Sequence, residues 1–293
     1  MQKYKHRLRN LPYPFLALAA LLCAQTNGLA QSILGSAEAY TLLGGSAITS
    51  SGAAGTVLAN GNVGLSSAAA DAIIGFPPAT INNGEILATS ALTAQAGSDL
   101  LRAAAGLAGL SADTDLSGID LGGLTLVPGV YRFSSSAALT GQLTLDAQGR
   151  DHAYWVFQIG TNFTTAANSG VSVIHFSSAG GQDLGLFWNA QAEITSGANN
   201  QLAGNYLSGT SITFGTGSAG SGRGLAVAAT TLDANQLDAR GGPAGGDWTG
   251  GLAYDGNGAL TAIPEPAAIL WLTPLMALGV ALLRRRTNHQ SAA

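Results

Sequence analysis

Charged and reactive side chains are scarce in this chain of 293 residues. Only 10% of the residues are charged, and the single cysteine, Cys23, lies in an apolar run near the N-terminus. If export removes that run, no disulfide can form, although the compartment would permit one. The stability of the remaining chain must then come from packing and backbone hydrogen bonds.

Positive charge is especially rare. Both lysines, Lys3 and Lys5, lie at the start of the chain, and residues 31–263 hold five arginines against 15 acidic residues, a formal balance of −10. Such a surface repels phosphate backbones, which excludes nucleic acid as a partner.

Familiar catalytic motifs are also missing. The chain has neither a Gly-x-Ser-x-Gly elbow nor a His-Glu-x-x-His helix. His152 lies in a polar turn and His175 in a strand-like run, so we expect both to be structural or solvated. Three aspartates fall in turn sequence, where Asp commonly caps and binds solvent: Asp113, Asp115 and Asp120. The sequence therefore predicts no catalytic residue, no cofactor and no metal site.

The N-terminus has the order of features found in secretory signal peptides. Residues 1–10 are basic, residues 11–24 are apolar, and Gly28-Leu29-Ala30 fits a cleavage site with small residues. We expect residues 1–30 to be removed. An uncleaved membrane anchor is the alternative, which the short apolar run disfavours.

The C-terminus also carries a compact set of signals. An apolar run, residues 267–283, is followed by arginines 284–286. The run is close to the minimum length for a spanning helix, and the arginines place residues 287–293 on the cytoplasmic side. Three residues precede the run: Pro264, Glu265 and Pro266.

This order over residues 263–286 resembles the PEP-CTERM sorting tail of Gram-negative bacteria. The resemblance implies that an exosortase-type membrane protease cuts near the Pro-Glu-Pro and releases the protein to the cell surface or exterior. The chain would then contact the membrane only transiently, through this tail. An ordinary C-terminal anchor is the alternative.

Between the two ends we expect one domain, residues 31–239, and a Gly-rich flexible linker, residues 240–262. Asp255-Gly-Asn-Gly in that linker lacks the further ligands of a calcium loop. Residues 85–110 are rich in Ala and Leu with apolar positions three and four apart, which predicts one long helix. The rest has the pattern of short strands and turns.

The strands repeat along the chain. Ile194, Ile212 and Leu232 occupy one place in successive copies, 18 and 20 residues apart, and Phe163 occupies it in an earlier copy. Apolar strands such as 155–159 lie between the copies. A period near 20 residues predicts a solenoid, in which stacked turns bury one another's apolar faces.

Two kinds of strand alternate in this repeat. In the first kind the residues beside each inward position point outward. They are Asn162 and Thr164, Glu193 and Thr195, Ser211 and Thr213, and Thr231 and Asp233. The second kind is apolar throughout, which indicates burial on both sides. We expect the helix to cover it.

Several stretches also resemble a microbial family of ice-binding proteins. The match begins at ILGSAEAYTLLGGSAITSSG (33–52), includes Pro-Gly-Val-Tyr (128–131) and Gly-Arg-Gly-Leu-Ala (222–226), and covers residues 33–239. The resemblance implies a mostly β fold: a right-handed β-solenoid of triangular section with a long helix alongside. It also implies that the N- and C-terminal parts of the solenoid are adjacent.

The same resemblance implies a secreted, non-enzymatic and monomeric protein that adsorbs to ice and inhibits its recrystallisation. Its flat face would carry the candidate residues Asn162, Thr164, Thr195, Ser211, Thr213 and Thr231. Glu193 and Asp233 depart from that pattern, because a charge orders water around itself. The alternative is an exported surface or biofilm-matrix adhesin without ice activity.

Overall fold

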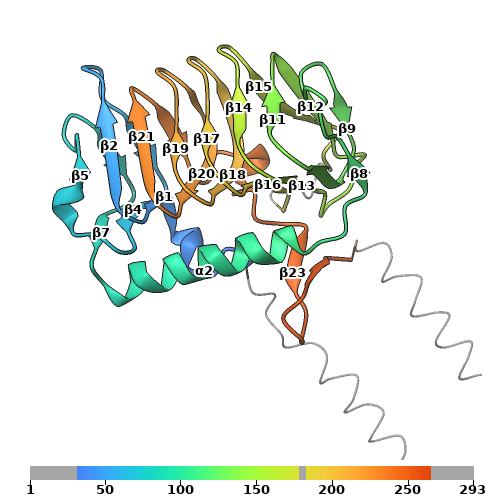
Figure 1. Cartoon of the computed structure of the whole chain (residues 1–293), viewed down its shortest axis with the longest axis horizontal. Coiled ribbons are helices and arrows are strands. Elements are labelled where there is room, and N and C mark those ends of the chain that lie inside the picture. The colour runs from blue at the N-terminus through green and yellow to red at the C-terminus, as the bar shows by residue number, and fades with distance from the viewer. Residues whose placement is uncertain (1–31, 178–182, 265–293) are drawn as a thin grey trace, which may run out of the picture. The chain divides into compact units, whose positions relative to one another are not determined.

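The computed structural model describes residues 32–177 and 183–264 of the chain. The strands of its two large sheets are parallel and stack coil on coil, so these residues form a β-solenoid with one α-helix along its side (Figure 1). This confirms the mostly β fold with a packed helix. The expected signal peptide, residues 1–30, and the expected spanning segment, residues 267–283, lie outside the described residues.

Each full coil contributes a strand to three faces, and each strand pairs with its counterpart in the next coil. The first face, the helix wall, lies beneath the helix. Its strands in spatial order are β7 (Ile86–Ala88), β4 (Asn62–Leu65), β1 (Tyr40–Gly44), β20 (Ala219–Ala226), β18 (Gln201–Ser208), β16 (Gly185–Ala190), β13 (Tyr154–Ile159), β10 (Gly129–Phe133) and β8 (Thr114–Asp115).

The other two faces meet solvent over most of their length. The second, the threonine face, consists of β5 (Ile73–Ile74), β2 (Ala47–Ser51), β21 (Ala229–Asp233), β19 (Ile212–Thr213), β17 (Ile194–Thr195), β14 (Phe163–Thr165) and β11 (Ala137–Leu139). The third face consists of β6 (Thr80–Asn82), β3 (Val57–Ala59), β22 (Gln236–Asp238), the first halves of β20 and β18, β15 (Gly170–Ile174), β12 (Gln142–Asp146) and β9 (Thr125–Leu126). Strands β18 and β20 pass from this face to the helix wall through Gly204 and Gly222, which pair with each other at φ values of +97° and +135°.

The N-terminal and C-terminal coils lie side by side. Strand β1 pairs with β20, β2 with β21, and β3 with β22. In Figure 1 the blue strand β2 therefore lies beside the orange strand β21. This confirms the expected adjacency of the two parts of the solenoid.

Helix α2 (Ala91–Ala108) spans the stack and begins later than expected. Ile86 and Leu87 belong to β7, and Ser90 caps the helix by accepting a hydrogen bond from the Thr93 amide. The helix therefore starts at Ala91 and not at residue 85. Its longest apolar side chains do not all face inward, because Leu92 and Leu101 are 67% and 56% exposed.

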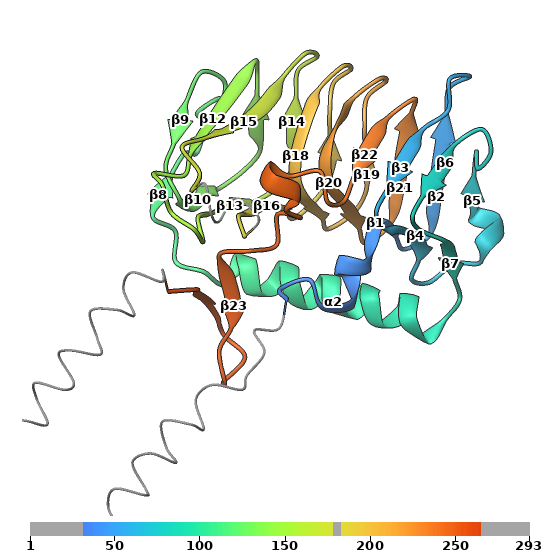
Figure 2. The ribbon, with the colours of Figure 1, turned by 180° about the vertical axis from the view of Figure 1, so that it is seen from behind.

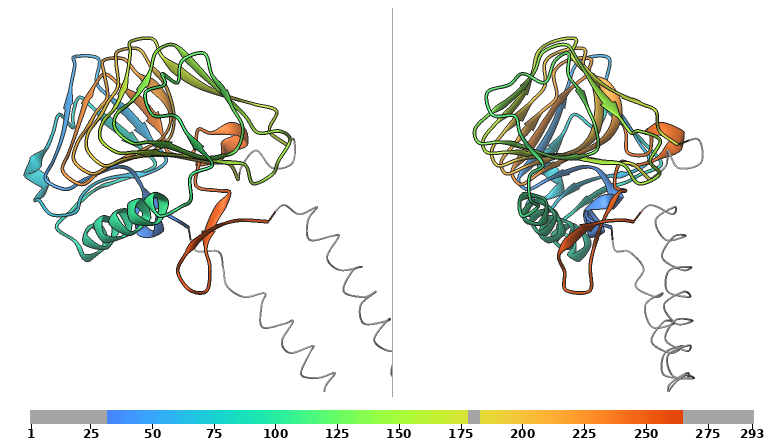
Figure 3. Two further views of the ribbon diagram at one scale, coloured as in Figure 1. Left: turned by 45° about the vertical axis from the view of Figure 1, so that its right-hand side comes forward. Right: turned by 90° about the vertical axis from the view of Figure 1, so that its right-hand side faces the viewer.

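The buried side of α2 lies on the helix wall. It consists of Thr93, Ala96, Asp99, Leu100, Ala103 and Leu107. Side chains of the wall bond to the last carbonyls of the helix: Asn189 donates to Ala104 over 2.9 Å, and Gln158 donates to Leu107 over 2.8 Å. Figure 3 shows the helix running beside the coils. Among the described residues no helix is both long and apolar enough to cross a membrane.

The interior of the solenoid is a stack of aromatic rings. Phe157 lies 4.2 Å from Trp188 between ring centroids, Tyr131 lies 5.5 Å from Phe157, and Tyr206 lies 6.1 Å from Trp188. These residues occupy matching positions on β10, β13, β16 and β18, so strand register alone aligns them. A second cluster fills the space between the helix wall and α2.

Residues 240–264, here the C-terminal strap, pack against the solenoid. The strap contains η3 (Pro243–Gly245) and an antiparallel pair, β23 (Leu252–Tyr254) and β24 (Leu260–Ala262). Trp248 is only 4% exposed and donates to Ser221 over 2.9 Å. Figure 2 shows η3 beside β18 and β20. The expectation of a flexible linker over residues 240–262 is therefore corrected.

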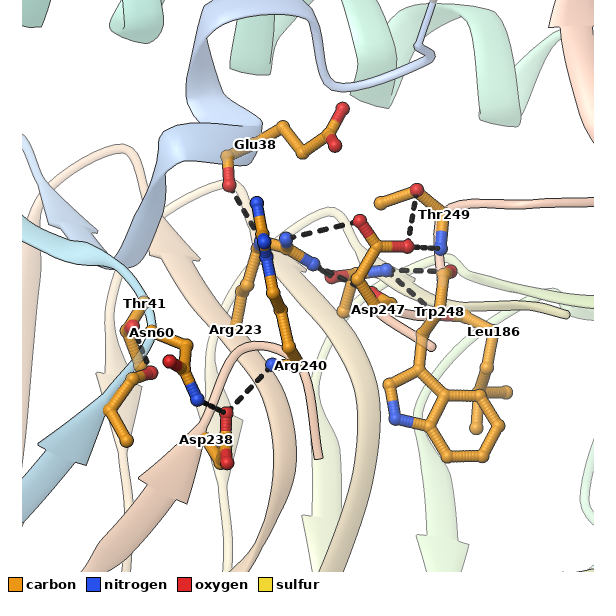
Figure 4. A network of polar contacts seen from close by, with 12 residues as sticks. Glu38, Thr41, Asn60, Leu186, Arg223, Asp238, Arg240, Asp247, Trp248 and Thr249 are labelled. Atoms are coloured by element: carbon orange, nitrogen blue, oxygen red, sulfur yellow. Dashed lines mark hydrogen bonds and ion pairs between the residues drawn. The ribbon is translucent and has the colours of Figure 1, made fainter. Parts of the chain in front are cut away.

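One buried arginine joins three parts of the chain (Figure 4). Arg223 on β20 donates to the Glu38 carbonyl over 3.0 Å, to Asn205 over 3.1 Å and to the Asp247 carbonyl over 2.6 Å. Burial lowers the pKa of Arg223, although the Asp247 carboxylate opposes that shift. Burial would raise the pKa of Asp247, but hydrogen bonds from Thr249 and the charge of Arg223 together hold it below its ordinary value. The strap thus supplies, through Asp247, hydrogen-bond acceptors to the buried Arg223 guanidinium, which is shielded from water.

Candidate functional site

Five threonines form one continuous row across the threonine face. Thr164 pairs with Thr195, Thr195 with Thr213, Thr213 with Thr231, and Thr231 with Thr49. Adjacent strands in a sheet lie about 4.8 Å apart, so the row repeats at that interval. Ala138 and Ile74 occupy the same register at its two ends.

The hydroxyl groups of this row are available to solvent. Within residues 32–177 and 183–264, none of the five hydroxyls donates or accepts a hydrogen bond. The inward neighbours, such as Ile194 and Ile212, are buried, whereas Thr164 and Thr231 are exposed. The strands therefore fix an array of methyl and hydroxyl groups without using those hydroxyls for their own stability.

The register of β21 differs from the one predicted. Ile212 pairs with Thr230 and not with Leu232, which instead pairs with Ser50. The repeat is thus 18 residues both from Ile194 to Ile212 and from Ile212 to Thr230. Thr230 is a buried threonine at a position where the two preceding copies have isoleucine, and this difference concealed the repeat.

The corrected register changes the composition of the face. Thr231 now lies opposite Thr213, and Asp233 moves out of the row to the corner of the coil. There its carboxylate accepts a hydrogen bond from Thr216 over 2.5 Å. One of the two charges that conflicted with an ice-binding face is therefore outside the central row.

The row also contains a residue that sequence reasoning missed. Thr49 comes from the N-terminal coil, far along the sequence from Thr231. The sequence around Thr49 does carry the same pattern, because Ala47-Ile48-Thr49 alternates in the same way as Ser211-Ile212-Thr213. Only the pairing of β2 with β21 shows that it extends the row.

All six candidate residues lie on or beside this face, but two of them accept hydrogen bonds from the backbone of the next coil. Asn162 accepts a hydrogen bond from the Glu193 amide over 3.2 Å, and the Ser211 hydroxyl accepts one from the Ala229 amide over 3.4 Å. They form a second row with Glu193, two residues before the threonines. The free hydroxyls therefore belong to the threonine row.

The third face is less regular. Its outer row runs through Gln142, Gly170, Gln201, Ala219 and Gln236, so long and short side chains alternate. The strap covers part of it, and α2 covers the helix wall. In the described part of the chain, the threonine face is the uncovered face that carries a row of identical side chains.

Among residues 32–177 and 183–264 the titratable groups are dispersed, mostly over the surface and the turns. His175 lies 3.0 Å from Asp146 at an exposed turn, and a hydrogen bond from the Gln148 amide lowers the pKa of Asp146. Asp255 accepts the amides of Asn257 and Ala259 and closes the turn between β23 and β24. No group of three metal-ligating side chains occurs among the described residues.

The described residues thus form a solenoid that presents a regular array of threonines on an uncovered face. Residues 42–238 match the model of the family described as Ice-binding-like. The chain is 42% identical over 226 residues to a protein named ice-binding protein from Nostoc sp. (strain HG1), covering 76% of this chain and 80% of that protein. The chain belongs to the Ice-binding-like family.

Solved structures of ice-binding proteins share the fold. One from the Antarctic ascomycete Antarctomyces psychrotrophicus is 34% identical with a TM-score of 0.63, covering 69% of this chain and 95% of that one. Another, from an Antarctic biological consortium, is 32% identical with a TM-score of 0.64, covering 73% and 94%. Both are described as ice-binding proteins.

Proposed function

We propose that this protein binds ice through its threonine face and thereby inhibits ice growth and recrystallisation. The observation that carries the proposal is the row of five threonines in register, whose hydroxyls have no partner among the described residues. The family of the chain supports it.

The physical mechanism needs no reactive group. Strands about 4.8 Å apart impose a repeat on the threonines that is close to a repeat of ice. The methyl groups favour an ordered cage of water, and the hydroxyls can bond that cage to the protein. Because β-branching restricts threonine χ1 and the strands fix the backbone, little conformational freedom is lost on binding. Adsorption at many such points then curves the ice front and arrests its growth.

Thermal hysteresis and recrystallisation of residues 32–264 test the proposal. We expect Thr213→Tyr to remove most of the activity, because a ring would project from the middle of the row. Exposed substitutions usually change the free energy of unfolding by no more than about 0.5 kcal/mol, so the melting temperature should remain close to wild type. A folded wild-type domain with neither activity would contradict the proposal and favour the surface-adhesin alternative.

We further propose that the chain is exported through residues 1–30 and sorted by residues 263–286. The order of Pro264, Glu265 and Pro266, the apolar run 267–283 and the arginines 284–286 supports an exosortase-type protease as a partner. Membrane contact would then be confined to this tail.

The finer features of the fold are also proposals. We infer a right-handed solenoid of triangular section from the resemblance of the motifs, and three faces per coil agree with it. A monomer without a cofactor or catalytic role suffices for the function, because one chain already presents all five threonines.

A further inference from the structure

The threonine face is not uniform along the solenoid axis. The residue two positions before each threonine changes from polar to small in the spatial order of the strands. The order is Asn162 on the β14 side, then Glu193, Ser211, Ala229 and Ala47. Half of the face therefore carries an amide and a carboxylate, and the other half carries neither.

Glu193 places an unneutralised charge in the plane of the face. It is exposed, and its carboxylate has neither an ion pair nor a hydrogen bond within residues 32–177 and 183–264. Two residues along a strand span about 7 Å, so this carboxylate lies next to Thr195 in the row. An ionised carboxylate holds its own hydration shell, and displacing that shell without a partner is costly. Contact between ice and this part of the face would therefore cost the free energy of displacing the hydration shell of Glu193.

Asp233, the other charge near the face, is held differently. Its carboxylate accepts a hydrogen bond from Thr216, and it lies so close to Gly52 that a side chain at that glycine would collide with it. The carboxylate is thus directed into the corner between coils and away from the threonine row.

The half without a carboxylate has a low, even surface. Ala47 and Ala229 pair with each other. Thr49 and Thr231, two residues further along the same strands, therefore have only small side chains beside them on the face. Ile74, which pairs with Thr49, is 58% exposed and adds an apolar side chain at the end of the row. An exposed isoleucine at this position extends the surface that the threonine methyl groups begin.

We propose that ice contact is concentrated on this half of the face, on β19, β21, β2 and β5, and that Glu193 sets its boundary. The inference rests on the proposed ice-binding function. The contact residues are Ser211, Thr213, Ala229, Thr231, Ala47, Thr49 and Ile74. Two N-terminal coils therefore supply three of the contact residues, although the repeat visible in the sequence lies in the C-terminal coils.

Matched tyrosine substitutions test where the contact lies. Thermal hysteresis is measured on full-length variants purified in one detergent, with wild type and detergent alone as references and melting temperatures as the check on folding. We expect Thr49→Tyr to lower hysteresis several-fold, and Thr164→Tyr to lower it much less. Gln142→Tyr on the third face is the control for an added exposed ring. Equal losses from Thr49→Tyr and Thr164→Tyr would overturn the proposal.

Removing the charge provides a test by gain of activity. Glu193→Ser should raise hysteresis, because it extends the neutral surface towards Thr195, whereas Asp233→Asn should leave it close to wild type. No increase from a folded Glu193→Ser variant would show that Glu193 sets no boundary. An inactive wild type would overturn the ice-binding function itself, whereas an active wild type with an unaltered Glu193→Ser variant overturns this inference alone.

Discussion

Thr230 and Thr231 are the same residue type in opposite environments. Thr231 is exposed in the row, whereas Thr230 is 1% exposed and lies between Ile212 and Ile48 on the neighbouring strands. The Thr230 hydroxyl is buried without a hydrogen-bond partner in the part of the chain that the structure describes. Because successive side chains on a strand point to opposite faces, Thr231 faces solvent and Thr230 faces the core.

We expect Thr230→Val to stabilise the domain. Valine keeps the branched shape and removes an unpaired buried hydroxyl, so the free energy of unfolding should rise by about 1 kcal/mol. Chemical denaturation measures the change, and Thr231→Val is the matched control, expected to alter stability by less than about 0.5 kcal/mol. A loss of stability in Thr230→Val would mean that the hydroxyl is bonded, for instance to a buried water.

Ala234 marks a second local misfit, at the corner between the threonine face and the third face. The equivalent corner positions in other coils are Asn168, Asn199 and Gly217, and all four residues have φ between +52° and +70°. Glycine adopts this left-handed region freely and asparagine at little cost, whereas alanine adopts it at a cost of about 1–2 kcal/mol.

We therefore expect Ala234→Gly to stabilise the domain by about 0.5–1 kcal/mol, the strain relieved less the entropy lost by glycine. The melting temperature should rise, while the threonine row keeps its geometry. Gly217→Ala is the converse variant and should lower it. Unchanged stability in both variants would show that the corner does not restrict φ.

At the scale of elements, the sequence predicted those that repeat locally and missed those that depend on distant contacts. Alternation such as Ser211-Ile212-Thr213 was enough to predict outward threonines. It failed at β21, because the inward position there holds Thr230, and it could not reveal Thr49, whose partner strand is distant in sequence. The strap was missed because its many glycines are typical of linkers, whereas its order depends on Trp248 and Asp247 meeting groups on β20.

The strap should be necessary for the stability of the domain. Removing it leaves the buried Arg223 without Asp247, and breaking a buried ion pair typically costs about 3–5 kcal/mol. It also uncovers the surface that Trp248 and Leu252 bury. We expect residues 32–239 to melt far below residues 32–264, or not to fold, in circular dichroism. Equal melting curves would show that the strap only rests on the solenoid.

At the scale of the whole molecule, the strap brings the end of the described chain to the side of the solenoid on which the helix lies. Its β23 and β24 lie beside the helix, as Figure 3 shows, and not on the threonine face. Leu260 packs against Gly106 of α2, and Arg102 of α2 lies 4.7 Å from the ring centroid of Tyr254. The described part of the chain thus ends, at Pro264, in a segment that packs against the helix and not on the threonine face.

The tail should accordingly direct location without contributing to the fold. Ile263 donates its amide to the Gly251 carbonyl over 3.0 Å, so a deletion that spares the strap must begin after Pro264. We expect deletion of residues 265–293 to leave the melting temperature of the purified domain unchanged and to alter its distribution between membrane, periplasm and medium in cell fractionation. The combined variant Pro264→Ala, Glu265→Ala and Pro266→Ala should retain the apolar run but accumulate uncut in the membrane fraction. If that variant is released as efficiently as wild type, the Pro-Glu-Pro is not a recognition sequence; if the deletion lowers the melting temperature, the tail belongs to the fold.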